Sequence, residues 1–163
     1  MHEDVAVSQY QDITGPKVKP AGLYLFWCGF LVCSPDGIIE TPSEGAAALG
    51  NNGLSEVKCP WKYRNAHIYE ILNSELKEKE KKDSFYLAKD KKLHKEHNYW
   101  FQVQAEMAAV GAEWAHFVIW TTKGIEIIEV ERDINWEEQY LPLLAKFYLN
   151  ELLPSICTDE SAN

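Results

Sequence analysis

The stretch SPDGIIETPSEGAAALGNNGLSEVKCP, residues 34–60, contains the features that best predict the fold of the chain. Two segments in it, II and LSEVKCP, are typical of strands, and the small residues and glycines between them favour a connection between paired strands. Side chains at positions i and i+2 of a strand lie on one face of the sheet. We therefore expect Glu56 and Lys58 to point the same way, with Asp36 beside Glu56 if the two strands form a hairpin.

The predicted cluster of Asp36, Glu56 and Lys58 has the composition of a metal-assisted hydrolytic site. Two neighbouring carboxylates repel each other unless a cation joins them, and oxygen ligands suit Mg²⁺ or Mn²⁺. The main-chain carbonyl of Val57 could supply a third ligand. Lys58 would then lie where it could orient or deprotonate a water and neutralise a phosphate, which is the chemistry of phosphodiester hydrolysis. The alternative is an ordinary ion pair on an exposed strand face.

The rest of the chain alternates irregularly between segments that favour helices and segments that favour strands. Hydrophobic periodicity, turn residues and helix-ending glycines indicate the boundaries. The predicted helices are 2–10, 65–82, 98–111 and 135–153. The predicted strands are 23–33 (one or two, with a turn or bulge at Gly29), 38–39, 54–60, 113–122 and 125–133. Loops are predicted at 13–22 and 41–53, and a short strand or loop anchor is predicted at 84–88. This order favours an α/β class (α+β in some schemes) with a central mixed β-sheet flanked by helices.

Particular residues are expected to begin, end or interrupt the helices. Asn98 can cap the helix that starts there, and Gly111 can end it. Pro142 is expected to kink or restart the last helix. We expect residues 155–163 to form a disordered tail.

The composition indicates a globular protein of one domain, which we place at residues 1–154. Of 163 residues, 46% are hydrophobic, and the longest apolar run, AGLYLFWCGFLVC, is too short to span a bilayer. The N-terminus lacks the basic and apolar regions of a signal peptide, so we expect an intracellular protein, nuclear or cytoplasmic. The four cysteines form no CxxC pair, and we expect them to be reduced.

Charge is distributed unevenly along the chain. The net charge is −9, which argues against a nucleic-acid partner, but residues 58–95 hold eleven of the sixteen Lys and Arg and only six Asp and Glu. A basic segment on an acidic protein can attract the phosphate backbone of a nucleic acid. The alternative is a solvated helix with ion pairs at i,i+4 spacing, as in ELKEKEKK.

Several phrases of the sequence together resemble one nuclease family. Asp36, Glu56 and Lys58, introduced by Pro35, follow the pattern D-x19-E-x-K of the PD-(D/E)xK nuclease superfamily. The phrases SPDGII, SEVKCPWKYR, YWFQVQAEMAAVG, EWAHFVIWT, GIEIIEVERD and LPLLAKFYLNELLP occur in order over nearly the whole chain. They are similar to the lambda-exonuclease branch of that superfamily, also called YqaJ-like viral recombinases or alkaline exonucleases.

The resemblance implies a restriction-endonuclease-like core and a Mg²⁺-dependent exodeoxyribonuclease, with Mn²⁺ able to replace Mg²⁺. Such an enzyme would degrade duplex DNA ends 5′→3′ in recombination or repair. The residues that match the family's site are the metal ligands Asp36, Glu56 and the Val57 carbonyl; the catalytic lysine Lys58; the motif glutamine Gln102; the acid Glu3 in the pattern E-x-x-A-x-x-x-Y; and Ser34, Lys62 and Arg64, which fall where the family contacts the 5′ phosphate.

The resemblance also implies partners. Duplex DNA ends would be the substrate, and a single-strand annealing protein is a candidate partner, whereas no membrane partner is expected. Relatives form toroidal trimers, although nothing in the sequence marks such an interface. Some relatives hold an iron–sulfur cluster with three cysteines near the C-terminus, where this chain has only Cys157, so no cluster is expected.

One departure from the family pattern keeps two other functions open. The family normally has a helical section before the acid matched by Glu3, and this sequence starts almost at that acid. That section takes part in recognising the 5′ phosphate and in shaping the DNA tunnel. The alternatives are therefore a DNA-binding or recombination module that has lost catalysis, and an endonuclease of the same fold.

Overall fold

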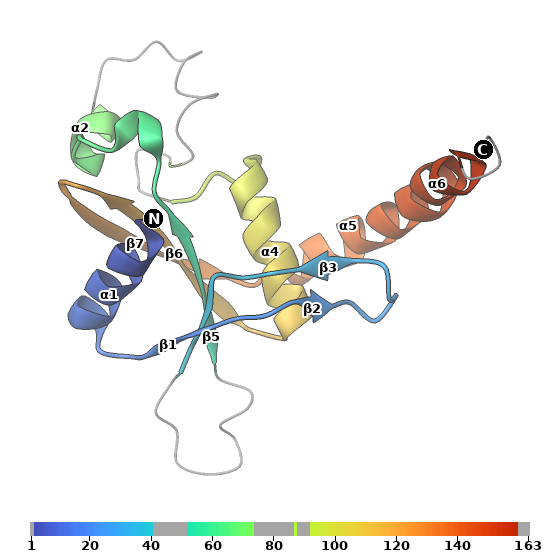
Figure 1. Ribbon diagram of the computed structural model, residues 1–163, viewed down its shortest axis with the longest axis horizontal. Coiled ribbons are helices and arrows are strands. Elements are labelled where there is room, and N and C mark those ends of the chain that lie inside the picture. Colours follow the sequence, from blue (N-terminus) through green and yellow to red (C-terminus); the bar gives the residue numbers. More distant parts are fainter. Residues whose placement is uncertain (1, 41–51, 74–86, 88–91, 160–163) are drawn as a thin grey trace.

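A five-stranded mixed β-sheet forms the centre of the protein (Figure 1). The structure is a computed structural model and describes residues 2–40, 52–73, 87 and 92–159. The strands are β1 (Val18–Pro20), β4 (Gly37–Ile39), β5 (Gly53–Lys58), β6 (Trp114–Thr121) and β7 (Gly124–Glu131). Their order is β1-β4-β5-β6-β7, with β5 and β6 parallel and all other neighbours antiparallel. The predicted mixed sheet is confirmed, as is the hairpin of β6 and β7.

Helix α1 (Glu3–Thr14) covers one face of this sheet. Ala6 and Tyr10 are almost fully buried and belong to an apolar cluster that includes Val57 of β5. Apolar residues four positions apart lie on one side of a helix, so this spacing docks α1 on the sheet. The Tyr10 hydroxyl also forms a hydrogen bond of 2.6 Å with His116 Nδ1 on β6. The predicted helix is confirmed and extends beyond its predicted end.

Helix α4 (Asn98–Val110) covers the opposite face of the sheet (Figure 1). Val103 and Met107 are fully buried in a second apolar cluster, which includes Leu54 of β5. Gly111 ends the helix with a φ of 78°, a left-handed conformation that glycine adopts without strain. Both the predicted helix and its predicted end are confirmed.

The predictions for the cap of α4 and for residues 18–20 were wrong. The cap of α4 is His97 and not Asn98, because His97 Nδ1 accepts a hydrogen bond of 3.1 Å from the Tyr99 N–H. Residues 18–20, predicted as part of a loop, form strand β1. Pairing with β4 at residues 37–39 supplies hydrogen-bond partners that so short a segment does not have locally.

A second, two-stranded sheet consists of β2 (Tyr24–Leu25) and β3 (Val32–Cys33). Gly29, between them, has a φ of 78°, which glycine tolerates without steric cost. Of the alternatives predicted for 23–33, the structure thus has two strands with a turn at Gly29, and both strands are shorter than predicted. The ring of Phe30 stacks on Tyr148 with 4.2 Å between centroids, so the hairpin contacts the C-terminal helix.

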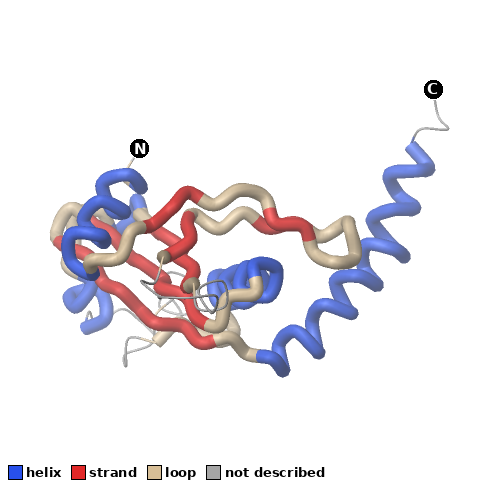
Figure 2. The backbone as a smooth tube through the Cα atoms, turned by 90° about the horizontal axis from the view of Figure 1, so that it is seen from below, coloured by secondary structure: helices blue, strands red, loops and turns tan. Residues whose placement is uncertain are grey.

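The chain ends in a long helical segment that projects from the rest of the molecule (Figure 2). Its parts are α5 (Ile134–Phe147), a π-helical turn (Tyr148–Leu152) and α6 (Leu153–Asp159). The helix continues through Pro142, so a restart there is wrong and a kink stays a prediction; the irregular turn lies further along. Residues 155–159, predicted as part of the tail, are helical, and 160–163 lie outside the described residues.

Other predictions fall partly or wholly outside the described residues. Of the predicted helix 65–82, the structure describes α2 (Ile68–Asn73), which follows a 3₁₀ turn at Trp61–Tyr63. Most of the predicted loop 41–53 lies outside the description. In the predicted anchor 84–88, Leu87 forms an isolated β-bridge with Leu93. Throughout the described part of the chain, no helix combines the length and the hydropathy needed to cross a membrane.

Candidate active site

The register of β4 on β5 places Asp36 next to Glu56. Gly37 pairs with Ser55 in an antiparallel ladder, so Asp36, one residue before, lies opposite Glu56, one residue after. Asp36 Oδ2 also accepts a hydrogen bond of 2.7 Å from the Val57 N–H. The predicted hairpin and the predicted proximity of the two acids are therefore confirmed.

Alternation along β5 separates its side chains between the two faces of the sheet. Leu54 belongs to the apolar cluster under α4, and Val57 belongs to the cluster under α1. Glu56 and Lys58 share the face of Leu54 because side chains at i and i+2 lie on the same side. Glu56 is only 2% exposed. The alternative of an ion pair on an exposed strand face is therefore wrong.

Glu56 Oε1 is the centre of a hydrogen-bonded group. It accepts a hydrogen bond from Lys58 Nζ and a second, of 2.6 Å, from Gln102 Nε2 on α4. Lys58 Nζ also lies 4.8 Å from the centroid of the Tyr99 ring, close enough for a cation–π contact. The structure thus brings Gln102 to Glu56 and Lys58, as predicted from the sequence, across 46 residues of chain.

Burial and neighbouring charges determine the electrostatics of this group. Burial raises the pKa of Glu56, and repulsion from Asp36 adds to that shift, while Lys58 opposes it. For Lys58, burial would lower the pKa, but the carboxylates of Glu56 and Asp36 outweigh burial, and the pKa is raised. Lys58 is therefore an ammonium ion at neutral pH, held beside two acids.

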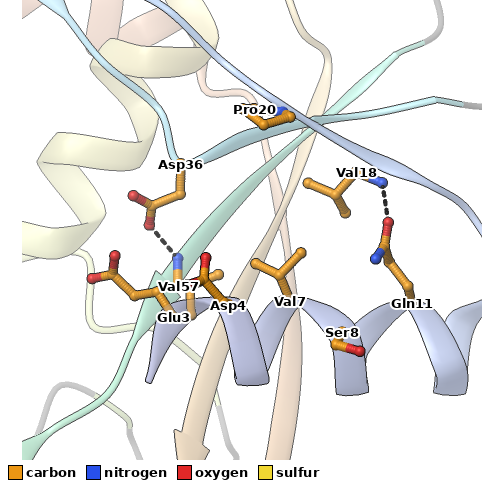
Figure 3. A pocket seen from close by; sticks show the side chains of 9 residues that line it. All are labelled: Glu3, Asp4, Val7, Ser8, Gln11, Val18, Pro20, Asp36 and Val57. Atoms are coloured by element: carbon orange, nitrogen blue, oxygen red, sulfur yellow. Dashed lines mark hydrogen bonds between the residues drawn. The ribbon is translucent and has the colours of Figure 1, made fainter. Parts of the chain in front are cut away.

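A pocket of about 290 Å³ opens between α1, β1 and the start of β4 (Figure 3). Its lining residues are Glu3, Asp4, Val7, Ser8, Gln11, Val18, Pro20, Asp36 and Val57. Glu3, from the first turn of α1, and Asp36 project into it from different elements. The structure thus also brings the predicted Glu3 to the same end of the sheet as Asp36 and Val57.

The Val57 carbonyl lies on the strand edge that faces Asp36. In a β-strand the N–H and the carbonyl of one residue point to the same edge, and the Val57 N–H points to Asp36. The pairing of β4 with β5 extends only to Ser55, so in the described residues no strand pairs with this edge of β5 at Val57. The carbonyl is therefore placed where the sequence predicts a ligand.

The donor set at this end of the sheet fits a hard divalent cation. Glu56 Oε2 is buried, and within the described part of the chain it has no hydrogen-bond partner. Together with Asp36 and the Val57 carbonyl it would form an all-oxygen set, and Mg²⁺ commonly takes one or two carboxylates and keeps several waters. No three His, Cys, Asp or Glu side chains of the described residues are arranged to hold a metal by themselves. A metal site here would therefore depend on the carbonyl and on water.

Glu106 is an acid of this site that the sequence pattern did not predict. It is 2% exposed on α4, and its Oε1 accepts a hydrogen bond of 2.9 Å from Gln102 Nε2. Burial, followed by repulsion from Glu56, raises the pKa of Glu106 to about 8. The sequence feature that could have indicated Glu106 is its i,i+4 spacing from Gln102, because residues at this spacing are neighbours on a helix.

The residues predicted to contact phosphate lie on exposed turns that flank the acids. Ser34 precedes Asp36 by two residues, and Lys62 and Arg64 follow β5. The Arg64 guanidinium lies 4.0 Å from the centroid of the Trp61 ring, and its Nη1 donates to the Trp61 carbonyl at 2.9 Å. In the described part of the structure, no hydrogen bond or ion pair connects these three residues to the acids.

Comparisons with known proteins agree with this fold. A family model described as the YqaJ-like viral recombinase domain matches residues 1–113. LHK-Exo in complex with dAMP is similar in structure, with a TM-score of 0.66 and 24% identity over 99% of this chain and 70% of that one. LHK-Exo from Laribacter hongkongensis, an alkaline exonuclease, gives a TM-score of 0.60 and 24% identity over 99% and 72%. Among curated proteins, none matches the chain.

Proposed function

The chain belongs to the YqaJ-like viral recombinase domain family, and on this premise we propose that it is a metal-dependent deoxyribonuclease. The observation that supports this most is the meeting of Asp36, Glu56 and Lys58 at one end of the sheet, beside an open pocket. Its reaction would be hydrolysis of DNA phosphodiester bonds. The mode we propose is 5′→3′ exonuclease action on duplex ends, in recombination or repair, in line with the alkaline exonuclease LHK-Exo.

Asp36, Glu56 and the Val57 carbonyl would hold Mg²⁺, or Mn²⁺ in its place. When bound, such a cation would polarise the phosphoryl oxygen and make the attacking water more acidic. The hydrogen bond from the Val57 N–H fixes the Asp36 carboxylate at the strand edge. Lys58 and Gln102 occupy Glu56 Oε1, so Oε2 remains for the cation.

Lys58 would act on the attacking water and on the charge of the phosphate. Its ammonium group is anchored by Glu56 and by the Tyr99 ring, and its side chain is 20% exposed, so it can still reach the substrate. A fixed positive charge at this point offsets the negative charge that develops on the phosphate during hydrolysis. Its raised pKa favours this role and the orientation of water over the role of general base.

Ser34, Lys62 and Arg64 would contact the 5′ phosphate of the strand that is degraded. The planar guanidinium of arginine offers a fixed fork of donors that suits phosphate oxygens. Arg64 is held in place at both ends: its carbonyl accepts hydrogen bonds from the Thr122 N–H and hydroxyl, and its guanidinium lies against Trp61. An arginine restrained in this way loses less conformational freedom when it binds.

The test of this proposal is degradation of linear duplex DNA by the wild-type protein and Lys58→Ala, with Mg²⁺ and with EDTA. We expect Mg²⁺-dependent degradation and a loss of about 100-fold or more in Lys58→Ala, the scale typical of a positioned proton-transfer or charge-stabilising group. Lys146→Ala, which removes an exposed lysine on α5, serves as the control and should retain full activity. Equal activity of wild type and Lys58→Ala would exclude Lys58 as the catalytic lysine.

The same assay separates the alternatives. Cleavage of a closed circular plasmid would identify an endonuclease, because an exonuclease needs an end. A wild-type protein that binds duplex DNA but degrades neither linear nor circular substrate would be a module without catalysis.

A further inference from the structure

The buried acid Glu106 has no part in the chemistry proposed above. It lies on α4 and is 2% exposed, and no group of the described residues forms a hydrogen bond with its Oε2. Its other oxygen, Oε1, accepts a hydrogen bond from Gln102. A buried carboxyl group with an unsatisfied oxygen costs free energy of folding, so its presence calls for a compensating role.

Gln102 connects Glu106 to Glu56 through a single nitrogen atom. Nε2 lies 2.6 Å from Glu56 Oε1 and 2.9 Å from Glu106 Oε1. An amide nitrogen carries two hydrogens, so it can donate to both acids at once. If the amide were turned over, its oxygen would face Glu56 Oε1, which already accepts a hydrogen bond from Lys58, so the hydrogen bond to Glu56 would be lost. The pair of acceptors therefore determines that Gln102 presents an N–H group to Glu56.

The orientation of Gln102 in turn determines which oxygen of Glu56 is available. Oε1 is occupied by Gln102 and Lys58, whereas Oε2 is buried without a partner among the residues that the structure describes. Loss of the hydrogen bond from Gln102 would allow the carboxylate to rotate. A carboxylate that must bind a cation with one particular oxygen would then be less well oriented.

We propose that Glu106 is a positioning residue that acts through Gln102 to orient the Glu56 carboxylate for a divalent cation. This inference rests on the proposed function, because it takes Glu56 as a metal ligand. Groups that orient metal ligands typically change metal affinity by 10- to 100-fold when they are removed. Glu106 needs only an oxygen that accepts a hydrogen bond for this role, and the neutral acid and the carboxylate both have one.

Two substitutions of similar size separate this role from direct metal binding. Glu106→Gln keeps an acceptor oxygen for Gln102 and removes the charge, whereas Glu106→Met removes the acceptor. Binding of Mn²⁺ to the full chain, measured by calorimetry, should weaken about tenfold in Glu106→Met and stay close to wild type in Glu106→Gln. Equal weakening in both variants would overturn the inference, since Glu106 would then act through its charge.

A double-mutant cycle tests whether the effect passes through Gln102. In a Gln102→Met background, Glu106→Met should cause no further loss of Mn²⁺ affinity, because the connecting amide is already absent. A second loss of the same size as in the wild-type background would overturn the inference. Far-ultraviolet circular dichroism of each variant establishes that it is folded.

A measurement without metal keeps the inference separate from the proposed function. In the metal-free protein, the side-chain amide signal of Gln102, identified by its absence in Gln102→Met, should show slow hydrogen exchange that becomes faster in Glu106→Met and stays slow in Glu106→Gln. An unchanged signal in Glu106→Met would overturn the inference. If the wild-type protein binds no Mn²⁺ but the amide signal responds as expected, the proposed function fails and the orienting contact stands.

Discussion

Asp36 accepts a hydrogen bond of 2.7 Å from the main-chain N–H of Val57, so a side chain at the start of β4 continues the ladder on β5. The contact takes the place of a strand partner just beyond the last paired residues, Gly37 and Ser55. It holds one acid of the candidate site at a fixed point relative to the other, Glu56. The folding of the hairpin and the geometry of the site are therefore coupled at Asp36.

Asp36→Asn should separate the structural contribution of Asp36 from its charge. The amide oxygen of Asn can still accept the hydrogen bond from Val57, so the melting temperature should stay near wild type, whereas the hard anionic ligand is lost. We expect nuclease activity to fall by about 100-fold or more. Calorimetry with Mn²⁺ should show little or no binding, and undiminished binding would remove Asp36 from the ligand set.

The two glutamines of the QVQ sequence should respond differently to substitution. Gln104 is 1% exposed, donates to the Glu131 carbonyl at 2.9 Å and accepts from the Asp133 N–H at 2.8 Å. Gln104→Met should therefore lower the free energy of unfolding by about 1–3 kcal/mol, because two main-chain groups lose their partner. Chemical denaturation checks this expectation, and Mn²⁺ affinity should not change.

Gln102→Met is the matched variant, two residues away on the same helix. It should reduce Mn²⁺ affinity about tenfold, because Gln102 orients Glu56. If Gln104→Met reduced metal affinity as much as Gln102→Met, the division of roles between the two glutamines would be wrong.

His116 should make folding stability depend on pH. Burial lowers its pKa below the ordinary value of 6.5, although Glu129 on the paired strand opposes the shift. As the pH falls below about 6.5, His116 therefore takes up protons more readily in the unfolded chain than in the folded one. The contribution of neutral His116 to the free energy of unfolding is complete above that pH and is lost as the pH falls. The free energy of unfolding should therefore carry a component that decreases between pH 7.5 and 5.5.

His116→Asn is the control for this pH dependence, because its side-chain amide can form a hydrogen bond with the Tyr10 hydroxyl, as donor or acceptor, without titrating. Denaturant unfolding at the two pH values should show a smaller loss of stability at low pH in His116→Asn than in the wild type. Equal losses in the two proteins would mean that His116 titrates alike in the folded and unfolded chains.

Arg64 should determine a preference for phosphorylated DNA ends. Arg64→Lys keeps the charge but loses the fork of donors and the stacking on Trp61, so the ratio of degradation rates for 5′-phosphorylated and 5′-hydroxyl duplexes should fall about tenfold. Rates on 5′-hydroxyl ends should change little. Lys146→Ala is the exposed-lysine control, and an unchanged ratio in Arg64→Lys would place the phosphate contact elsewhere.

Salt should weaken DNA binding through the basic segment. Affinity for duplex DNA, measured by fluorescence anisotropy with Ca²⁺ in place of Mg²⁺, should rise as salt is lowered, because lysine contacts release counterions from the phosphates. Reversing the charge of the lysines in 77–82, a segment outside the described residues, should weaken binding and flatten the salt dependence. A flat response to the reversal would mean that these lysines do not contact the phosphate backbone of the DNA.

The sequence was sufficient to predict the acids and the lysine at one end of a mixed sheet. Side chains alternate with a period of two in any strand, so Glu56 and Lys58 share a face whatever surrounds them. A glycine-rich connection between two short apolar segments favours a hairpin, and the hairpin places Asp36 beside Glu56. These are local properties, and local properties can be inferred from neighbouring residues. The i,i+4 pattern that docks α1 and α4 is of the same kind.

Other features depend on residues that are distant in the sequence. Strand β1 exists because β4 offers a free edge, and residues 18–20 have no strand pattern of their own. The burial of Glu106, and with it the link from Glu106 through Gln102 to Glu56, exists only where α4 lies on β5. Desolvation and long-range pairing come from the tertiary arrangement, so they were decided by the folded structure and not by the local pattern.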